Sequence, residues 1–154
     1  MNEELSVIKT MLYSHCQQIV NERIYHAEQG ILHAKDAAKG DTKSSAGDKY
    51  ETTREMMQQE IDRNERQLAE ANKLKYQLDG VPITSVSNTI QLGSLVKTND
   101  GLFFLSISLG TVELTSYRFF VISPISPFGQ VLLGKQVGDC VEFNRRNYEI
   151  LAFT

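Results

Sequence analysis

The chain has 154 residues, a formal net charge of −3 and two cysteines. A protein that binds nucleic acid through a basic face needs clustered Lys and Arg, so the acidic balance argues against that class. No apolar run approaches the roughly 20 residues that span a bilayer. An acidic start without a following apolar stretch predicts no signal peptide. Cys16 and Cys140 form no CxxC pair, which favours a reduced, cytoplasmic protein without membrane contact.

The two halves of the chain differ in charge. Residues 1–80 contain 11 Lys and Arg against 14 Asp and Glu, whereas residues 81–154 contain five of each. This difference indicates two modules. We expect an α+β protein with an antiparallel coiled-coil hairpin at 1–79, a linker at 80–88 and a small β domain at 89–154.

Two helical patterns build the expected hairpin. Apolar residues spaced by threes and fours define one face of a first helix, from about 3 to 38: Leu5, Ile8, Leu12, Cys16, Val20, Ile24, Ala27, Ile31, Ala34 and Ala38. Residues 39–48 lack this spacing and predict a turn at the tip. A second helix from about 48 to 78 has a heptad-like seam: Tyr50, Met57, Ile61, Asn64, Leu68, Ala71, Lys75 and Leu78. Gly80 and Pro82 end it.

The pattern after Pro82 changes to short runs typical of strands. Runs rich in Val, Ile, Leu, Phe and Thr lie at 89–92, 94–98, 102–108, 119–123, 141–143 and 147–152. Asn99-Asp100-Gly101 predicts a hairpin turn between two of them. Ser-Pro at 126–127 predicts the start of a short helix over 126–133. The second half is therefore expected to be a small, mainly antiparallel sheet with one helix.

Several short motifs in this half carry a resemblance. They are Ser126-Pro127, Leu132-Leu133-Gly134-Lys135, Gly138-Asp139, Tyr148-Glu149-Ile150 and Gly93-Ser94-Leu95-Val96. In these motifs the chain resembles the C-terminal domain of the bacterial Gre transcript-cleavage factors, which are transcription elongation factors. The expected hairpin is similar in length and position to the Gre coiled coil. Gly40-Asp41 resembles the opening of the family's tip sequence, G-D-L-x-E-N-A-E-Y.

The resemblance implies an FKBP-like fold for the C-terminal domain and RNA polymerase as the partner. In that family the C-terminal domain docks at the rim of the polymerase's secondary channel, and the hairpin enters the channel. Acidic tip residues then help to hold a Mg²⁺ ion at the polymerase active site, where water cuts backtracked RNA. Such a factor contacts nascent RNA only indirectly and has no catalytic residues or intrinsic cofactor of its own. Oxygen ligands from one or two carboxylates suit Mg²⁺, and a two-metal site suits phosphoryl chemistry.

The tip departs from the family pattern. Aligned from Gly40-Asp41, the second acid of the family falls on Ser44, and aligned from Tyr50 it falls on Ala46. The paired carboxylate is missing, so we expect weak or absent stimulation of cleavage, with Asp41 as the one Mg²⁺ contact shared with polymerase. The tip candidates are Asp41, Ser44, Ser45 and Asp48. The docking candidates are Ser126, Pro127, Phe128, Gly134, Lys135, Gly138 and Asp139.

Each candidate also has a structural interpretation. Ser44, Ser45 and Asp48 can cap a helix, and Asp41 can close a turn. The docking candidates can start a helix, allow turns with φ > 0 or, for Phe128, fill the core. Arg145-Arg146 suits an exposed turn or a polymerase contact. The three histidines lack partners for a Zn site.

Three other functions stay open. A true cleavage factor would use Asp41 with Asp48. A peptidyl-prolyl isomerase is suggested by the FKBP-like fold alone, and fold does not imply function. A coiled-coil adaptor would self-associate, whereas a hairpin that buries its own seam is expected to be a monomer.

Overall fold

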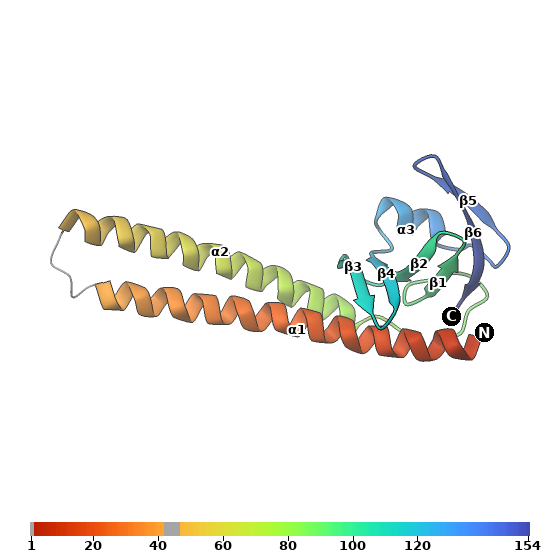
Figure 1. The fold of residues 1–154 in the computed structure, drawn as a ribbon, viewed down its shortest axis with the longest axis horizontal. Helices are drawn as coiled ribbons and strands as arrows, with labels where there is room; N and C mark the ends of the chain where they lie inside the picture. Colours follow the sequence, from red (N-terminus) through yellow and green to blue (C-terminus); the bar gives the residue numbers. More distant parts are fainter. Residues whose placement is uncertain (1, 42–46) are drawn as a thin grey trace. The chain divides into compact units, whose positions relative to one another are not determined.

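The computed structural model describes residues 2–41 and 47–154 (Figure 1). Helix α1 spans Asn2–Asp41 and helix α2 spans Gly47–Asp79, and the two pack as a hairpin-like pair. Gly40 and Asp41, which were expected in the turn, belong to α1. Glu3 and Glu4 in its first turn and Lys39 in its last turn suit the helix dipole, which favours such an extended helix.

The seam of α1 is confirmed, because every apolar position predicted for it is buried or half-buried. In α2, Asn64 is buried at the seam as predicted, but Lys75 is exposed and Leu74 is half-buried instead. The steps from Ala71 to Leu74 and from Leu74 to Leu78 are three and four residues, so this series keeps the apolar side chains on the inner face. The prediction of a lysine on the seam was therefore wrong by one residue.

The chain forms two compact units, and their division falls inside the helices. One unit is Gln18–Lys75, which we call the outer hairpin, and the other joins Met1–Gln17 to Tyr76–Thr154. In the second unit the Tyr13 hydroxyl donates to the Leu78 carbonyl oxygen at 2.9 Å. This hydrogen bond fastens the first part of α1 to the end of α2.

The C-terminal part of the chain folds into a six-stranded sheet with the order β3-β4-β2-β1-β6-β5. The hairpin turn expected at Asn99-Asp100-Gly101 is confirmed between β1 and β2, where Thr98 Oγ1 donates to the Gly101 carbonyl at 2.9 Å. The strands are β1 Leu95–Thr98, β2 Gly101–Leu105, β3 Gly110–Leu114, β4 Tyr117–Ile122, β5 Cys140–Phe143 and β6 Arg146–Phe153.

The sheet is mainly antiparallel, as expected, but it is mixed, because one of the five strand pairs in its described strands is parallel. Strands β2 and β4 pair in parallel, from Leu102 opposite Phe119 to Leu105 opposite Ile122. The cause is β3, which the sequence did not predict. The chain leaves β2, forms β3 at the sheet edge and turns back, so that β4 enters between β3 and β2 in the same direction as β2.

The strand expected at 89–92 is absent, although Ile90 is fully buried. Ile90 exchanges backbone hydrogen bonds only with the segment after the short helix, to Gly134 and Lys135. The chain then turns at Gly93, where φ is +93° and an added Cβ would lie 1.8 Å from the Pro82 carbonyl oxygen. Only glycine fits this position, and the turn prevents a longer strand.

Aromatic rings fill the core of the sheet domain. The Phe103 and Phe128 ring centroids lie 4.7 Å apart, and the Phe128 and Tyr148 centroids lie 4.8 Å apart. Phe128 belongs to helix α3, Pro127–Leu132, which carries it onto the sheet. The other buried members of this cluster are Ile90, Val96, Leu105, Leu132, Val141 and Ile150.

Candidate functional site

The first candidate region is the end of the hairpin, where α1 ends and α2 begins. Asp41 is the last residue of α1, and Asp48 is the second residue of α2. The predictions for Ser44 and Ser45 lie outside the described residues. The Asp41 and Asp48 positions are thus helix ends rather than parts of one continuous turn over 39–48.

The second candidate region is residues 126–139, which we call the signature segment. Its start is a capped helix. Ser126 has φ −65° and ψ 156°, and its hydroxyl accepts from the Gly129 amide at 3.1 Å and donates to the Ser123 carbonyl at 2.6 Å. Pro127 follows in the first turn, where its missing N–H is no loss. The short helix and its Ser-Pro start are confirmed.

The rest of the signature segment is a turn held by backbone hydrogen bonds. Gly134 has φ +80° and Gly138 has φ +92°, values that favour glycine. The Gly138 amide donates to the Ile150 carbonyl at 2.8 Å. The carboxylate of Asp139 accepts from the Gln136 amide at 2.8 Å. The interactions of Ser126, Phe128, Gly134, Gly138 and Asp139 in this structure are therefore those of fold-forming residues.

This turn also lines an open groove of about 740 Å³, which we call the sheet groove. The groove has no charged side chain, and its most exposed apolar residues are Val137 at 60% and Leu151 at 42%. Its other lining residues are Ser87, Asn88, Gln136, Ala152 and Phe153. The groove therefore exposes two apolar side chains among mainly polar neighbours.

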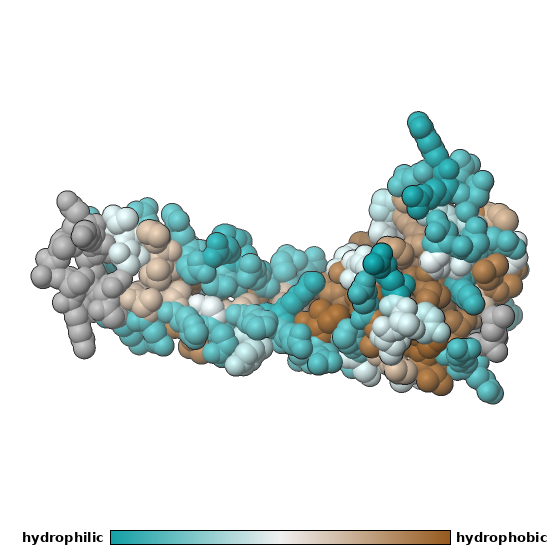
Figure 2. Space-filling view, viewed as in Figure 1, coloured by the Kyte–Doolittle hydropathy of each residue, from teal (hydrophilic) through white to brown (hydrophobic). Residues whose placement is uncertain are grey.

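Sequence reasoning missed Val137 and Leu151. Leu151 had a signal, because Tyr148, Ile150 and Ala152 alternate as the buried face of β6 and leave Leu151 as an apolar residue on the outer face. Val137 had no comparable signal, since the turn that exposes it depends on hydrogen bonds to β6. In the view of Figure 2, hydrophilic residues cover most of the hairpin, whereas hydrophobic residues gather on the sheet domain.

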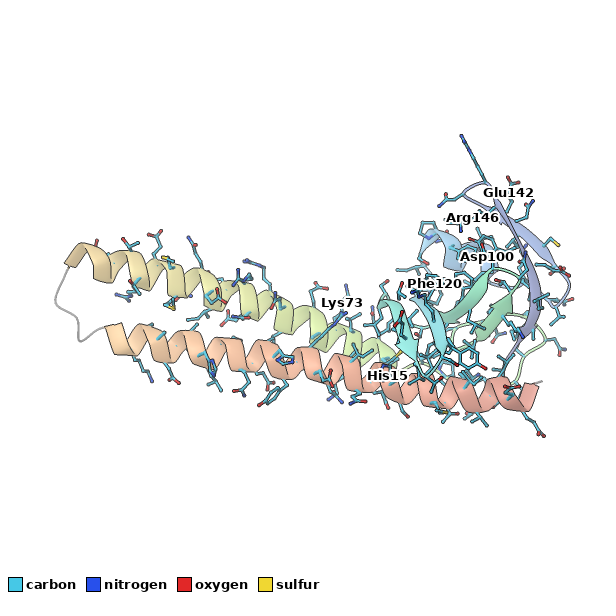
Figure 3. All side chains as sticks on the ribbon, viewed as in Figure 1. His15, Lys73, Asp100, Phe120, Glu142 and Arg146 are labelled. Carbon is cyan, nitrogen blue, oxygen red and sulfur yellow. The ribbon has the colours of Figure 1, made fainter. Side chains whose placement is uncertain are left out.

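Arg145 lies in the turn between β5 and β6, and Arg146 begins β6; both are exposed as expected. Asn144 and Arg145 have φ values of +49° and +65°, as in the two-residue turns that suit hairpins. Arg146 lies 3.5 Å from Asp100 of the β1–β2 turn, an exposed ion pair (Figure 3). Such an exposed ion pair contributes little to stability, so breaking it costs little. Arg146, like Arg145, is therefore available to a partner.

Burial on the first turns of α1 changes two titratable groups. Lys9 is only 3% exposed in a small cavity that includes Pro82, Ser85 and Ser94, and burial lowers the pKa of its ammonium group. Burial raises the pKa of Tyr13; the negative charge of Asp79 raises it further, and a hydrogen bond to Gln17 opposes both effects. Lys9 was not predicted to be buried, although it lies on the same helix face as Leu5 and Leu12.

The two cysteines lie in the hairpin seam and in strand β5. Burial raises the pKa of Cys16 to about 12, so its thiol stays protonated in the seam as predicted, and Cys140 lies in β5. Within residues 2–41 and 47–154, no three His, Cys, Asp or Glu side chains are grouped to hold a metal ion.

Phe128 is a core residue, as favoured from the sequence.

A comparison with models of known protein families, a search of curated proteins and a search of solved structures each returned no match. Across the described residues, no helix is long and apolar enough to cross a membrane.

Proposed function

We propose that this protein is a Gre-like factor that binds bacterial RNA polymerase and places its hairpin in the secondary channel. The observation that carries the proposal is one chain that joins a long helical hairpin to a sheet domain with the signature segment 126–139. At about 1.5 Å per residue, helices of 33 and 40 residues are about 50 and 60 Å long. This length suits a probe that acts far from its docking site.

The proposed action is occupancy of the channel, which modulates elongation and pausing with weak or absent stimulation of RNA cleavage. The tip sequence lacks the family's paired carboxylate, because the second acid is replaced by Ser44 or Ala46, and Lys39 and Lys43 flank Asp41 in the sequence. Any Mg²⁺ there would be held mainly by polymerase carboxylates, with Asp41 as one contact. The protein is then an accessory factor rather than an enzyme.

The sheet groove is the proposed docking surface, in a domain that we take to be FKBP-like. Most of the signature segment is occupied by its own fold: Ser126 caps α3, Phe128 fills the core and the glycines shape a turn. Val137, on the same turn, is a large apolar residue that is 60% exposed to solvent. The signature segment therefore supports docking through the surface that it shapes rather than through each of its own side chains.

The test is RNA cleavage in backtracked elongation complexes of the cognate polymerase, with binding measured in the same samples. We expect binding with little or no added cleavage, together with a change in pausing. Failure to bind the cognate polymerase would refute the proposal. Binding with strong cleavage would instead favour a true cleavage factor, and Asp41→Asn would then abolish cleavage while leaving binding intact.

A further inference from the structure

The outer hairpin has a groove of about 600 Å³ between α1 and α2, which we call the arginine groove. Arg23 and His26 line it from α1, and Arg63 and Arg66 line it from α2. Its floor is apolar and includes Ala71 and Leu74. All of these residues lie within Gln18–Lys75, so the groove belongs to one compact unit.

Small residues at the seam leave this space open. Ala27 and Ala71 are each only 3% exposed, and at Gly30 an added Cβ would lie 2.6 Å from Asn64 Oδ1. The helices are therefore in close contact through short side chains. These side chains are too small to fill the space between the residues that flank the seam. The longer side chains that line the groove include three arginines, Arg23, Arg63 and Arg66.

The charge of the groove is opposite to that of the hairpin around it. Three arginines line it against one acid, Glu70, although residues 1–80 as a whole are acidic. Arg63 is paired with Glu60. Among the ion pairs of the described residues, none involves Arg23 or Arg66. Two guanidinium groups from opposite helices are thus available at one apolar pocket.

We propose that the arginine groove binds a free nucleoside di- or triphosphate. Guanidinium groups form bidentate hydrogen bonds with phosphate oxygens, so Arg23 and Arg66 would hold the phosphate chain from two sides. The apolar floor, with Ala71 and Leu74, would take the base. The His26 ring, which stands edge-on to Tyr25 with centroids 5.9 Å apart, adds an aromatic surface at the rim.

The size and composition of the groove favour a small ligand over an acidic protein segment. Pockets for small ligands commonly have volumes of about 300–1,000 Å³ and mix apolar walls with a few polar groups. A stable protein interface needs a much larger surface. A compact anion with one flat apolar part satisfies both the cationic sides and the apolar floor of the groove.

The experiment uses the full chain without polymerase, so it is independent of the function proposed above. ATP and GTP are titrated into ¹⁵N-labelled protein, and affinity is measured in parallel by calorimetry. We expect saturable binding with amide shifts confined to residues 23–30 and 63–74. In the double variant Arg23→Gln/Arg66→Gln, affinity should fall at least tenfold while the thermal midpoint stays near that of the wild type.

Two controls separate the alternatives. Arg54→Gln, an exposed arginine of α2 outside the groove, should leave the affinity unchanged. Inorganic tripolyphosphate should bind at least tenfold more weakly than ATP, because it lacks the base. Equal binding of tripolyphosphate, equal loss in Arg54→Gln, or binding of single-stranded RNA without binding of free nucleotide would each overturn the proposal, as would the absence of saturable shifts.

Discussion

In the outer hairpin the buried side chains are small or medium in size, whereas the sheet domain buries large aromatic rings. Ala27, Ala34, Ile61 and Ala71 are among the most buried residues of the hairpin, and Phe103, Phe104 and Phe119 are among those of the domain. Hairpin contacts repeat every three or four residues along two helices. The sheet core depends on a few large residues that come from distant parts of the chain.

This difference predicts different responses to mutation. A long seam spreads its stability over many small contacts, so one change has a limited, local effect. A core built around a few rings loses a large share of its buried apolar area when one ring is removed. The hairpin is therefore suited to variation in surface and charge, and the domain is suited to holding one fixed surface.

The largest expected effect is in the aromatic core. Phe128→Ala should lower the free energy of unfolding by about 3–5 kcal/mol, because it removes a ring that contacts Phe103, Phe143 and Tyr148. Urea denaturation followed by circular dichroism measures the change. Ile125→Ala, at an 81% exposed position, should change stability by less than about 0.5 kcal/mol. Similar losses in the two variants would contradict the role of Phe128 in the core.

The next effect tests the tight contact in the hairpin. Gly30→Ala should destabilise by about 1–2 kcal/mol, since its new methyl group would force Asn64 to move, despite the better helix propensity of alanine. Adding Asn64→Ala makes room, so the double variant should be more stable than the sum of the two changes by about 1 kcal/mol. A double-mutant cycle in urea measures this coupling. Strict additivity would show that the contact is not made.

A third change tests the sheet groove as the polymerase-docking surface. Val137→Glu puts a charge on an exposed apolar residue and should weaken binding to the cognate polymerase about tenfold, or about 1.4 kcal/mol. Stability should hardly change, because the side chain is 60% exposed. The matched control is Val7→Glu on α1, 61% exposed and outside this groove. Equal weakening in both variants would point to charge alone rather than to the groove.

The smallest effect concerns Lys9, whose pKa is lowered by burial. The folded state binds the proton less tightly than the unfolded state, so stability rises with pH from the lowered folded value up to the ordinary value of 10.5. Lys9→Met should therefore stabilise the protein by about 1 kcal/mol at pH 7. This gain should shrink as the pH approaches 10.5. Urea denaturation of both proteins at pH 7 and pH 10 measures the stability gained by Lys9→Met. A gain that is the same at both pH values would exclude the buried charge as its cause.

Local patterns made the hairpin and the signature segment predictable. The three-four spacing placed the seam of α1, Ser126-Pro127 gave the start of α3, and Asn99-Asp100-Gly101 gave the β1–β2 turn. These features depend on residues close in sequence, where side-chain spacing and backbone preference act directly. Lys75 was misplaced because the seam of α2 there continues through Leu74, one residue earlier.

Long-range pairing was not predictable from the same patterns. Edge strand β3 is only five residues long and buries little beyond Val112, and without it the parallel β2–β4 pair could not be anticipated. Burial of Lys9 depends on residues 82–94 and the end of β6, which are far away in sequence. Of the candidate site, the signature residues were found, but the exposed Val137 and Leu151 were not.

The joining of Met1–Gln17 to Tyr76–Thr154 in one compact unit has a consequence for synthesis on the ribosome. Leu5 and Leu12 are buried residues that leave the ribosome before Tyr76–Thr154, the rest of their compact unit, which is completed only by β6. Synthesis adds about 5–20 residues per second, so these side chains stay without their partners for several seconds or more. The start of α1 is then a natural site for chaperone contact. Mutations in these residues would therefore lower the yield of protein in cells.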